Sequence, residues 1–589
     1  MNKLSNSTNT DLATVPNRGN DELRVPNDIL ALGDPVGWTD QTGTGPDGAD
    51  RKPRLAEHTK LLRQTKERCS PFSAPDGRGY ADIRNRGHRE TLLIRGPAFK
   101  NWLINQYYEA FEEAPSAEAR ERVIGTYEAM ANRCDEVRPV HLRVAAHDGK
   151  FYLDLGDASW RAVEMDADGW RLVDAPPVRF RRSPSMEALP TPEHGGSIEA
   201  LRKFLNTSSE EDWVLAIAWL LASLRPSGPY PVLVLSGELG TAKSTASRIL
   251  RSLTDPNGAP TRSLPRSEQD LAIAADNSHV LAFDNVSQLG GWASDALCRL
   301  ATGGGFATRT LYTGRDEEVF SAVRPTILNG IPDFVTRGDL ASRSIHMYLE
   351  PIVQEQRRPE RELWREFNAA RPAILGALLD IASEGLRALP TLKKPDRLPR
   401  MADFALWILA CEEGLWEPGT FAAAFAGNSD EAVATALDGD PYAALVRKLA
   451  LRPEGWAGTA TEFAEAAVRE LVLLDKGRSP AAKVVGERLR RAAPLLRQEG
   501  IAIEFGRQGQ AGHRVIRIAG PAQSVEAELS AALQALDWHY SYSDDSACYS
   551  AGDSAWRRIV ELCARVDPTT ARDLFAQWCP GDSPCACPV

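Results

Sequence analysis

Apolar positions along the chain change their spacing several times, and each change marks a predicted element. Leu92–Arg133 has a helical pattern, because large apolar residues recur three and four positions apart. Between about 141 and 173, short β-like runs are punctuated by Asp-Gly pairs that are typical of turns. These patterns predict a small α+β module over 89–190. The preceding stretch, 1–88, is polar and aperiodic, and we expect it to be mostly disordered.

The central part of the chain alternates short apolar runs with helical patterns. Four runs are predicted as strands: Val232–Ser236, Val280–Phe283, Thr326–Leu328 and Ile345–Leu349. Their nearly continuous apolar character indicates a sheet that is covered on both faces. We therefore expect an α/β core over 191–355, with Trp213–Leu224 as a buried helix, and a helical region over 356–440.

The pattern changes again near the C-terminus. Thr459 and Glu462 have the spacing of a capping box and open one predicted helix, and Ser479-Pro480 opens a second. Two β-like runs then surround a glycine-rich tip. Helix, turn, helix and hairpin are the order of a winged helix-turn-helix, which we expect over 441–522, before a tail of 523–589.

Composition favours a soluble, cytoplasmic protein of several domains. Of the 589 residues, 43% are hydrophobic and 25% are charged, which are ordinary values for globular proteins. No apolar run approaches the ~20 residues that a membrane helix needs, and the N-terminus has no apolar signal segment. The formal net charge of -11 excludes a global positive field, so any nucleic acid must bind to local basic patches.

The nine cysteines are scattered without a Cys-x-x-Cys pair, and we expect reduced thiols. Three of them, Cys579, Cys585 and Cys587, lie near the C-terminus and could bind a metal ion together with His539. Because the spacings of zinc sites are absent, a frayed tail is the simpler interpretation.

The strongest chemical signal follows the first central strand. A glycine-rich loop leads directly into a helix, so backbone N–H groups can surround phosphates at the positive helix N-terminus. Lys243 can reach the β- and γ-phosphates of ATP, and the Ser244 hydroxyl can ligate Mg²⁺. The predicted nucleotide-binding residues are Gly237, Glu238, Leu239, Gly240, Thr241, Ala242, Lys243, Ser244 and Thr245.

One position departs from the P-loop pattern Gly-x4-Gly-Lys-[Ser/Thr], because Ala242 replaces the second glycine. Alanine tolerates helical backbone angles, so we expect the loop to close with Ala242 beginning the helix turn. An ordinary strand-to-helix connection with a chance lysine is the alternative.

A second group is needed to anchor Mg²⁺, and Asp284 supplies it at the end of an apolar strand. The next residue is Asn285, where many such ATPases have the glutamate that polarises water. Asparagine can orient water but cannot accept its proton. The general base that accepts this proton then lies elsewhere in the protein, or ATP hydrolysis is slow.

Two further positions suit roles at the γ-phosphate. Asn329 ends a predicted strand and could sense the phosphate or the attacking water, although it could instead only shape a turn with Gly330. Arg343 precedes the last predicted strand and could act in trans as an arginine finger. A surface ion pair with Asp339 is the alternative for Arg343.

Together, Gly237–Ser244, Asp284-Asn285, Asn329 and Arg343 resemble the superfamily 3 helicases of the AAA+ class. The resemblance is closest to the primase-helicases of phages, plasmids and poxviruses, and to uncharacterised ATP-binding proteins of bacterial mobile elements. It implies a hexameric ring with MgATP bound between subunits. We find no primase carboxylate set in the N-terminal module.

In the helicases that the chain resembles, a hairpin carries a basic residue to DNA in the central channel. The matching stretch here is Arg309–Phe320, and its candidate contacts are Arg309 and Arg315, with Tyr312 as a stacking residue. Gly305 stands where relatives often have an acidic residue. Glu317-Glu318 also makes this hairpin less basic than the resemblance implies.

The predicted winged helix supplies the second set of candidate DNA contacts. The phosphate-binding candidates are Lys483, Arg488, Arg491, Arg507 and Arg514, with Arg490 and His513 nearby. Glu487 and Glu499 reduce the positive charge of this surface. A winged helix that packs against protein instead of DNA is the alternative.

The sequence as a whole predicts a DNA-dependent P-loop ATPase, a ring-forming helicase or DNA-remodelling motor of a mobile element. Its expected cofactors are ATP and Mg²⁺, and its expected partners are DNA and further copies of the chain. An ATP-gated DNA-binding switch without unwinding activity is the second hypothesis. A degenerate P-loop that serves as a scaffold is the third, and it predicts no ATP binding.

Overall fold

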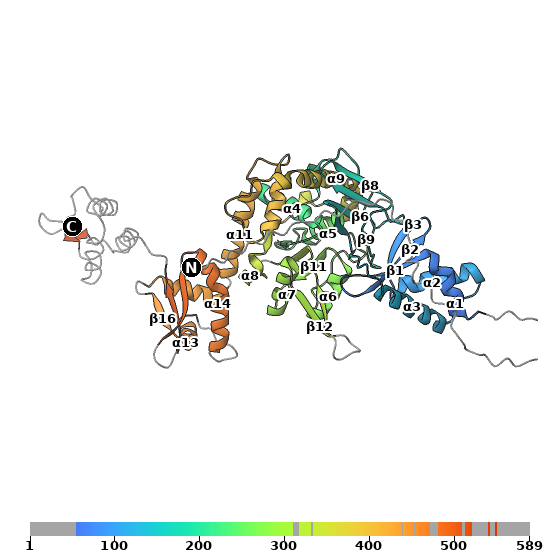
Figure 1. Cartoon of the computed structure of the whole chain (residues 1–589). Helices are drawn as coiled ribbons and strands as arrows, with labels where there is room; N and C mark the ends of the chain where they lie inside the picture. The colour runs from blue at the N-terminus through green and yellow to red at the C-terminus, as the bar shows by residue number, and fades with distance from the viewer. Residues whose placement is uncertain are drawn as a thin grey trace, which may run out of the picture.

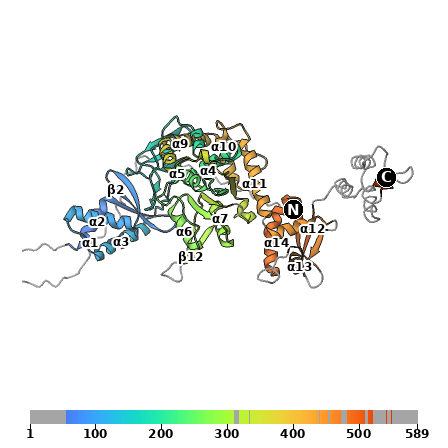
Figure 2. The same ribbon diagram turned by 180° about the vertical axis from the view of Figure 1, so that it is seen from behind.

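The computed structural model describes residues 55–309, 317–331, 334–438, 440–452, 455–471, 481–508 and 513–520, and the short strand pair 540–541 and 548–549. Figures 1 and 2 show the first part of the N-terminal module (residues 57–132) and the C-terminal domain (residues 441–519) at opposite ends of a central α/β domain. Within the described residues, none of the helices combines the length and apolar character needed to cross a membrane.

Among the described residues, the N-terminal module contains two antiparallel sheets. Its first part consists of α1 (Glu57–Thr65), β1 (Cys69–Ser73), β2 (Gly79–Asn85), β3 (His88–Leu93), α2 (Pro97–Phe111) and α3 (Ala117–Asn132). Its second part consists of β4 (Val140–His141), β5 (Val144–His147), β6 (Lys150–Asp154), β7 (Ala162–Asp166), β8 (Gly169–Val173) and β9 (Arg179–Phe180). The sheets have the orders β1-β2-β3 and β5-β6-β7-β8, and β4 pairs with β9.

The predicted boundary at residue 88 is wrong. Residue 88 begins β3, which pairs with β2 in an antiparallel hairpin, so this boundary would cut a sheet. Leu61, Phe72 and Tyr80 are buried, although they lie in the stretch that was expected to lack structure. The polar composition of 55–88 conceals these elements, because a few well-spaced apolar residues on one face are sufficient for packing.

The central domain is built around a parallel sheet. In chain order it contains α4 (Glu210–Ser223), β10 (Val232–Ser236), α5 (Lys243–Thr254), α6 (Glu268–Asn277), β11 (Leu281–Val286), α7 (Gly291–Thr302), β14 (Thr326–Gly330), α8 (Gly338–Ala341) and β15 (Ser344–Tyr348). The strand order is β11-β14-β10-β15, and every neighbouring pair is parallel. All four runs that were predicted as strands form this sheet, and their carboxyl ends meet at one edge.

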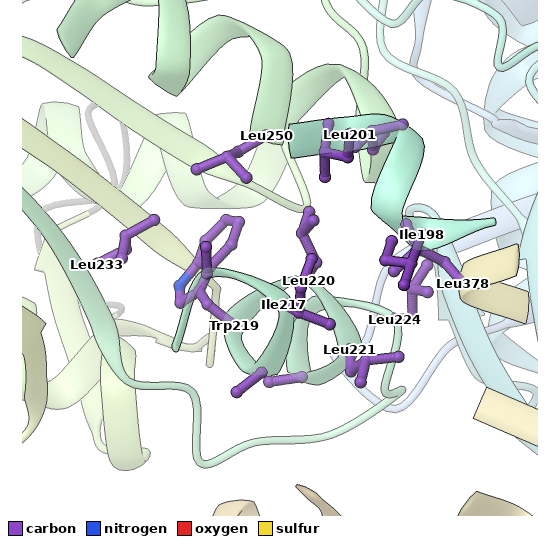
Figure 3. Close-up of a cluster of buried hydrophobic side chains, with 14 of the residues drawn as sticks. Ile198, Leu201, Ile217, Trp219, Leu220, Leu221, Leu224, Leu233, Leu250 and Leu378 are labelled. Atoms are coloured by element: carbon purple, nitrogen blue, oxygen red, sulfur yellow. The ribbon is translucent and has the colours of Figure 1, made fainter. Parts of the chain in front are cut away.

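Both faces of the parallel sheet are buried, as the apolar runs predicted. Leu233 and Leu235 of β10 pack in one hydrophobic cluster with α4, α5 and the later helix α9 (Glu360–Ala388), whereas Val232 and Val234 pack in another with α6 and α7. Successive side chains on a strand point to opposite faces, so an apolar residue is needed at every position. Figure 3 shows Trp219 and Leu220 of α4 in the first cluster. The prediction of a buried helix at Trp213–Leu224 is confirmed.

Three helices follow the central sheet: α9 (Glu360–Ala388), α10 (Ala402–Glu412) and α11 (Thr420–Asp438). Helix α11 contacts the edge strand β15. The side chain of Asn428 accepts a hydrogen bond from the backbone N–H of His346 at 2.9 Å, and its Nδ2 atom donates to the carbonyl of the same residue at 2.5 Å. The amide of Asn428 therefore satisfies the backbone N–H and carbonyl of His346 at the free edge of β15, as a neighbouring strand would.

The C-terminal domain consists of α12 (Pro441–Ala450), β16 (Trp456–Gly458), α13 (Ala460–Leu471), α14 (Ala482–Gln498), β17 (Ala502–Gln508) and β18 (His513–Ala519). The sheet order is β16-β18-β17, so a third strand, absent from the sequence prediction, joins the predicted hairpin. Thr459 and Glu462 form the predicted capping box, with mutual bonds of 2.6 and 3.2 Å. The start of the second helix at Ser479-Pro480 lies outside the described residues.

Candidate functional site

A six-residue connection, Gly237–Ala242, joins β10 to α5 and is called the glycine loop below. Gly237 has φ +151° and Gly240 has φ +83°, conformations that favour glycine. A Cβ atom on Gly237 would lie 2.4 Å from the carbonyl oxygen of Leu349, so a side chain does not fit there. Thr241 is buried, whereas Leu239 is 92% exposed. The loop therefore has a closely packed base and an open rim.

Ala242 does not begin the helix with the expected helical angles. It is the N-cap residue of α5 and has φ +61° and ψ +29°, in the left-handed region. This conformation costs an L-residue with a Cβ atom about 1–2 kcal/mol. The glycine that the P-loop pattern has at this position would adopt it without that cost. The loop therefore closes in spite of Ala242, and the strain is retained in the fold.

The N-terminus of α5 has no side-chain cap. Ala242 makes no side-chain capping hydrogen bond, so its side chain satisfies none of the N–H groups of the first turn. Lys243 stands at this end of the helix and donates from Nζ to the carbonyls of Gly237 at 2.8 Å and Glu238 at 2.6 Å. Burial lowers the pKa of Lys243, and the nearby Asp284 opposes this effect. The backbone N–H groups and the ammonium group together give this end a positive potential.

The hydroxyl of Ser244 and the carboxylate of Asp284 lie together beside the glycine loop. Ser244 Oγ donates to Asp284 Oδ1 at 3.0 Å, although the residues are 40 positions apart. Asp284 lies at the carboxyl end of β11, and its backbone N–H donates to the carbonyl of Arg262 at 2.9 Å. Hydroxyl and carboxylate oxygens are ligands that Mg²⁺ prefers. This pair therefore fits the predicted magnesium ion.

Asn285 lies in an irregularity of the sheet. The register between β11 and β14 shifts between Phe283 and Val286, and Asn285 has φ +57° there, a conformation that asparagine tolerates better than most residues. Its backbone N–H donates to Asn329 Oδ1 at 3.0 Å. The exposed side chain of Asn285 is thereby held at the same sheet edge as Asp284.

Asn329 links the strand ends to helix α5. It is 1% exposed, and its Nδ2 atom donates to Ser247 Oγ at 2.9 Å. The oxygen and the nitrogen of its amide are therefore both used within the protein. The structure brings Asn329 to the predicted edge of the sheet, and Ser247, one turn after Lys243, is a partner that the sequence analysis missed.

Arg343 lies between α8 and β15 and contacts its own chain. Its Nη1 atom donates to the carbonyl of Asp339 at 2.7 Å and lies 3.5 Å from the Asp339 carboxylate. Arg400 reaches the same carboxylate at 3.5 Å. The ion pair that the sequence left as an alternative is thus present in the single chain. The role of Arg343 in trans stays a prediction.

The glycine loop has two supporting residues for which the sequence offered no signal. Asn206 donates from Nδ2 to the carbonyl of Thr241 at 3.3 Å and to that of Glu350 at 2.7 Å. Arg357 lies beside Gly240, where a Cβ atom would be 3.4 Å from its Nη2 atom. Both residues come from segments distant in sequence, so only the folded chain shows their position.

The hairpin that was predicted to contact DNA is described only in part. Strands β12 (Gly305–Arg309) and β13 (Glu317–Ser321) pair antiparallel, with Arg309 opposite Glu317. Tyr312 and Arg315 lie outside the described residues. The candidate metal ligands His539, Cys579, Cys585 and Cys587 also lie outside them, and the described part of the chain contains no cluster of three metal-binding side chains.

The structure separates the predicted DNA-binding residues of the C-terminal domain into two groups. Lys483, Arg507 and Arg514 line a groove of about 980 Å³ between α14 and the β17–β18 hairpin, together with Arg490 and Glu487. This arrangement places residues from one helix and two strands on one basic surface.

The second group faces the central domain. Arg488 and Arg491 line a different cavity, of about 350 Å³, whose other wall includes Arg337 and Asp339. The guanidinium of Arg488 also lies over the ring of Tyr442, 5.1 Å from its centroid. These two arginines are therefore at a domain boundary, which the helical pattern of α14 alone did not reveal.

Comparisons with known proteins match the central and C-terminal parts. Residues 198–417 match the family model of the actinomycete integrative conjugative element replication protein, and residues 442–534 match the model of the AICE RepA C-terminal domain. No curated protein matches the chain.

Among solved structures, the chain is similar to the one titled SCCmec type IV Cch, active helicase, with 12% identity over 77% of this chain and 94% of that chain and a TM-score of 0.39. It is also similar to the NrS-1 C-terminal region, with 12% identity, 80% and 99% coverage and a TM-score of 0.37. In chain order, the matched parts are thus similar to the two domains of a replication protein of a mobile element.

Proposed function

We propose that this chain is a DNA-dependent ATPase that acts as a helicase-like motor in the replication of a mobile element. The observation that carries the proposal is the Ser244–Asp284 hydrogen bond beside Lys243 and the open N-terminus of α5. A P-loop ATPase needs these groups together: N–H groups and an ammonium for the phosphates, and two oxygens for Mg²⁺. The match to a replication-protein family supports the biological role.

MgATP would be held by groups that the chain already brings together. Lys243 would move from the loop carbonyls to the β- and γ-phosphates, and Ser244 and Asp284 would hold the metal directly or through water. Bound Mg²⁺ neutralises charge that develops on the phosphates. Asn285, whose exposed amide lies at the same edge, would orient the attacking water without accepting its proton.

DNA would bind at the basic groove of the C-terminal domain, a winged helix in this proposal. Lys483, Arg507 and Arg514 would meet backbone phosphates, a contact that is independent of sequence and weakens with salt. The β12–β13 hairpin would contribute Arg309 in a ring of subunits. Because Arg488 and Arg491 face the central domain, we assign them to domain contact instead.

The test is ATP hydrolysis by the purified chain with and without single-stranded DNA. We expect DNA to stimulate turnover, Lys243→Ala to abolish it, and the control Lys203→Ala, at an exposed lysine distant in sequence, to leave it unchanged. Equal turnover with and without DNA, over a range of salt concentrations and DNA forms, would contradict the motor proposal.

A second candidate is an ATP-gated DNA-binding switch. It is favoured by Asn285, which leaves Asp284 without a neighbouring carboxylate to activate water. Footprinting separates the two functions: a protected site of defined sequence that needs ATP binding, without strand separation, indicates the switch.

A further inference from the structure

A second cluster of cations lies at the far end of helix α5, away from the glycine loop. The C-terminal half of α5, the segment 256–260 and helix α9 line a half-open cavity of about 340 Å³. Three arginines line it, Arg248, Arg251 and Arg371, and we call it the arginine cavity. Eight helical positions separate Lys243 from Arg251, or about 12 Å at 1.5 Å per residue, so this cavity is separate from the candidate ATP site.

Arg251 is a buried cation whose charge has no carboxylate partner within ion-pair distance in the described chain. It is 1% exposed and donates to the carbonyls of Asp255 at 3.3 Å, Ala259 at 2.8 Å and Pro260 at 2.9 Å. Its Nη2 atom is buried and has no hydrogen-bond partner among the residues that the structure describes. Leaving such a donor unsatisfied is unfavourable, because the N–H loses its water without gaining an acceptor.

Arg371, on helix α9, is a second arginine with an unsatisfied buried donor. It donates from Nη2 to the carbonyl of Ser252, while its buried Nε atom has no partner among the described residues. Burial lowers the pKa of Arg251 and that of Arg371 to about 10, which shows how poorly the site solvates two positive charges. Arg248 differs, because it is paired with Glu360 at 2.6 Å.

The other residues that line the arginine cavity indicate a ligand that is larger than an inorganic anion. The volume corresponds to roughly ten water molecules, which is larger than one phosphate ion. Glu187 lines the cavity as well, and a carboxylate there would repel an anion but accept hydrogen bonds from hydroxyl groups. Trp364 adds an indole ring to the wall.

We propose that the arginine cavity binds a small phosphate ester that carries hydroxyl groups, such as a sugar phosphate. Its phosphate would accept hydrogen bonds from Arg251 and Arg371, and its hydroxyls would donate to Glu187. Because the ligand would contact α5, the helix that begins at Lys243, its binding would stabilise the helix that supports the glycine loop.

The test is calorimetric titration of the full chain with ribose 5-phosphate, inorganic phosphate and ribose. The experiment is repeated with Lys243→Ala, which silences the candidate ATP site, so failure of the proposed ATPase function does not affect the result. We expect saturable binding of ribose 5-phosphate in both proteins, binding of inorganic phosphate about tenfold weaker, and none of ribose. Equal affinity for inorganic phosphate would overturn the assignment to an ester.

Two substitutions locate the site without disturbing the buried Arg251. Arg371→Gln removes one cation, and Asn368→Asp adds a carboxylate at an exposed position of the lining. Each should weaken ribose 5-phosphate binding by about tenfold or more, whereas the control Arg365→Gln, at a side chain 72% exposed on the same helix, should not. Unchanged affinity in both variants, no binding to the parent chain, or binding of a short single-stranded DNA alone would overturn the proposal.

Discussion

The hydroxyl of Ser244 and the carboxylate of Asp284 are hydrogen-bonded at 3.0 Å, one at the start of a helix and the other at the end of a strand. In a parallel sheet, the carboxyl ends of neighbouring strands and the helix that follows a strand share one edge. The bond therefore results from the topology of the sheet. It also identifies the pair of residues whose substitution is most informative.

Asp284→Asn should separate nucleotide binding from hydrolysis. Asparagine has the same shape and can still accept a hydrogen bond from Ser244, but it lacks the charge that anchors Mg²⁺. We expect ATP binding to persist and turnover to fall by about 100-fold or more. Turnover as a function of Mg²⁺ concentration measures the effect. Asp270→Asn is a matched control, because Asp270 also bonds a serine hydroxyl, that of Ser267 at 2.7 Å.

Ala242→Gly should stabilise the protein. Glycine removes the cost of the left-handed conformation at φ +61°, and we expect a gain of about 1 kcal/mol, or a few degrees in Tm. Ala422→Gly, at an exposed position within α11, should instead lower stability by about 1 kcal/mol. Thermal unfolding of both variants checks the sign. A lower Tm for Ala242→Gly would contradict the strain assigned to this loop.

Arg343 can be tested for a role between subunits by mixing two inactive variants. Lys243→Ala should lose ATP binding. Arg343→Ala should bind ATP but hydrolyse it at least about 10³-fold more slowly than the parent chain. If a site takes its lysine from one subunit and its arginine from the next, mixed oligomers contain some intact sites. Partial recovery of hydrolysis on mixing is the expected result. Without recovery, the ion pair with Asp339 accounts for Arg343.

His346 should make the chain less stable in mild acid. Burial lowers the pKa of His346 to about 4 from the ordinary 6.5. Between pH 6.5 and 4 the unfolded chain binds a proton at this residue and the folded chain does not, so stability falls as pH falls through this range. Asp212 and His346 line one cavity beside β15. Asp212 opposes the effect of His346 on stability, because burial raises the pKa of Asp212 to about 6 and its folded form binds the proton.

His346→Gln isolates the histidine contribution, since Asp212 is present in both proteins. The variant should lose less stability than the parent chain between pH 6.5 and 4, by up to about 1.4 kcal/mol per pH unit. Urea unfolding at several pH values measures the difference. His147→Gln, at an exposed histidine, serves as the control. Parallel pH profiles for His346→Gln and the parent would show that His346 does not couple to folding.

The sequence by itself determined the central elements and the order of the chemical groups. Continuous apolar runs predicted the four parallel strands, because a strand covered on both faces needs an apolar residue at every position. The order of strand, glycine loop, Lys243 and Ser244, with Asp284 after a later strand, then implied that these groups meet. Local patterns carry this information, since spacing along the chain decides which side chains share a face.

The tertiary structure decided what depends on contacts between distant segments. It showed the left-handed backbone of Ala242 and the hydrogen bonds that join the Asn329 amide to Asn285 and Ser247. It also showed that some α14 arginines line a groove and others lie at a domain boundary. It also showed ordered strands in the polar stretch before residue 88. Backbone angles in a loop and the partners of a buried amide or guanidinium are set by packing and by the need to satisfy buried polar groups. Neither leaves a pattern in neighbouring residues.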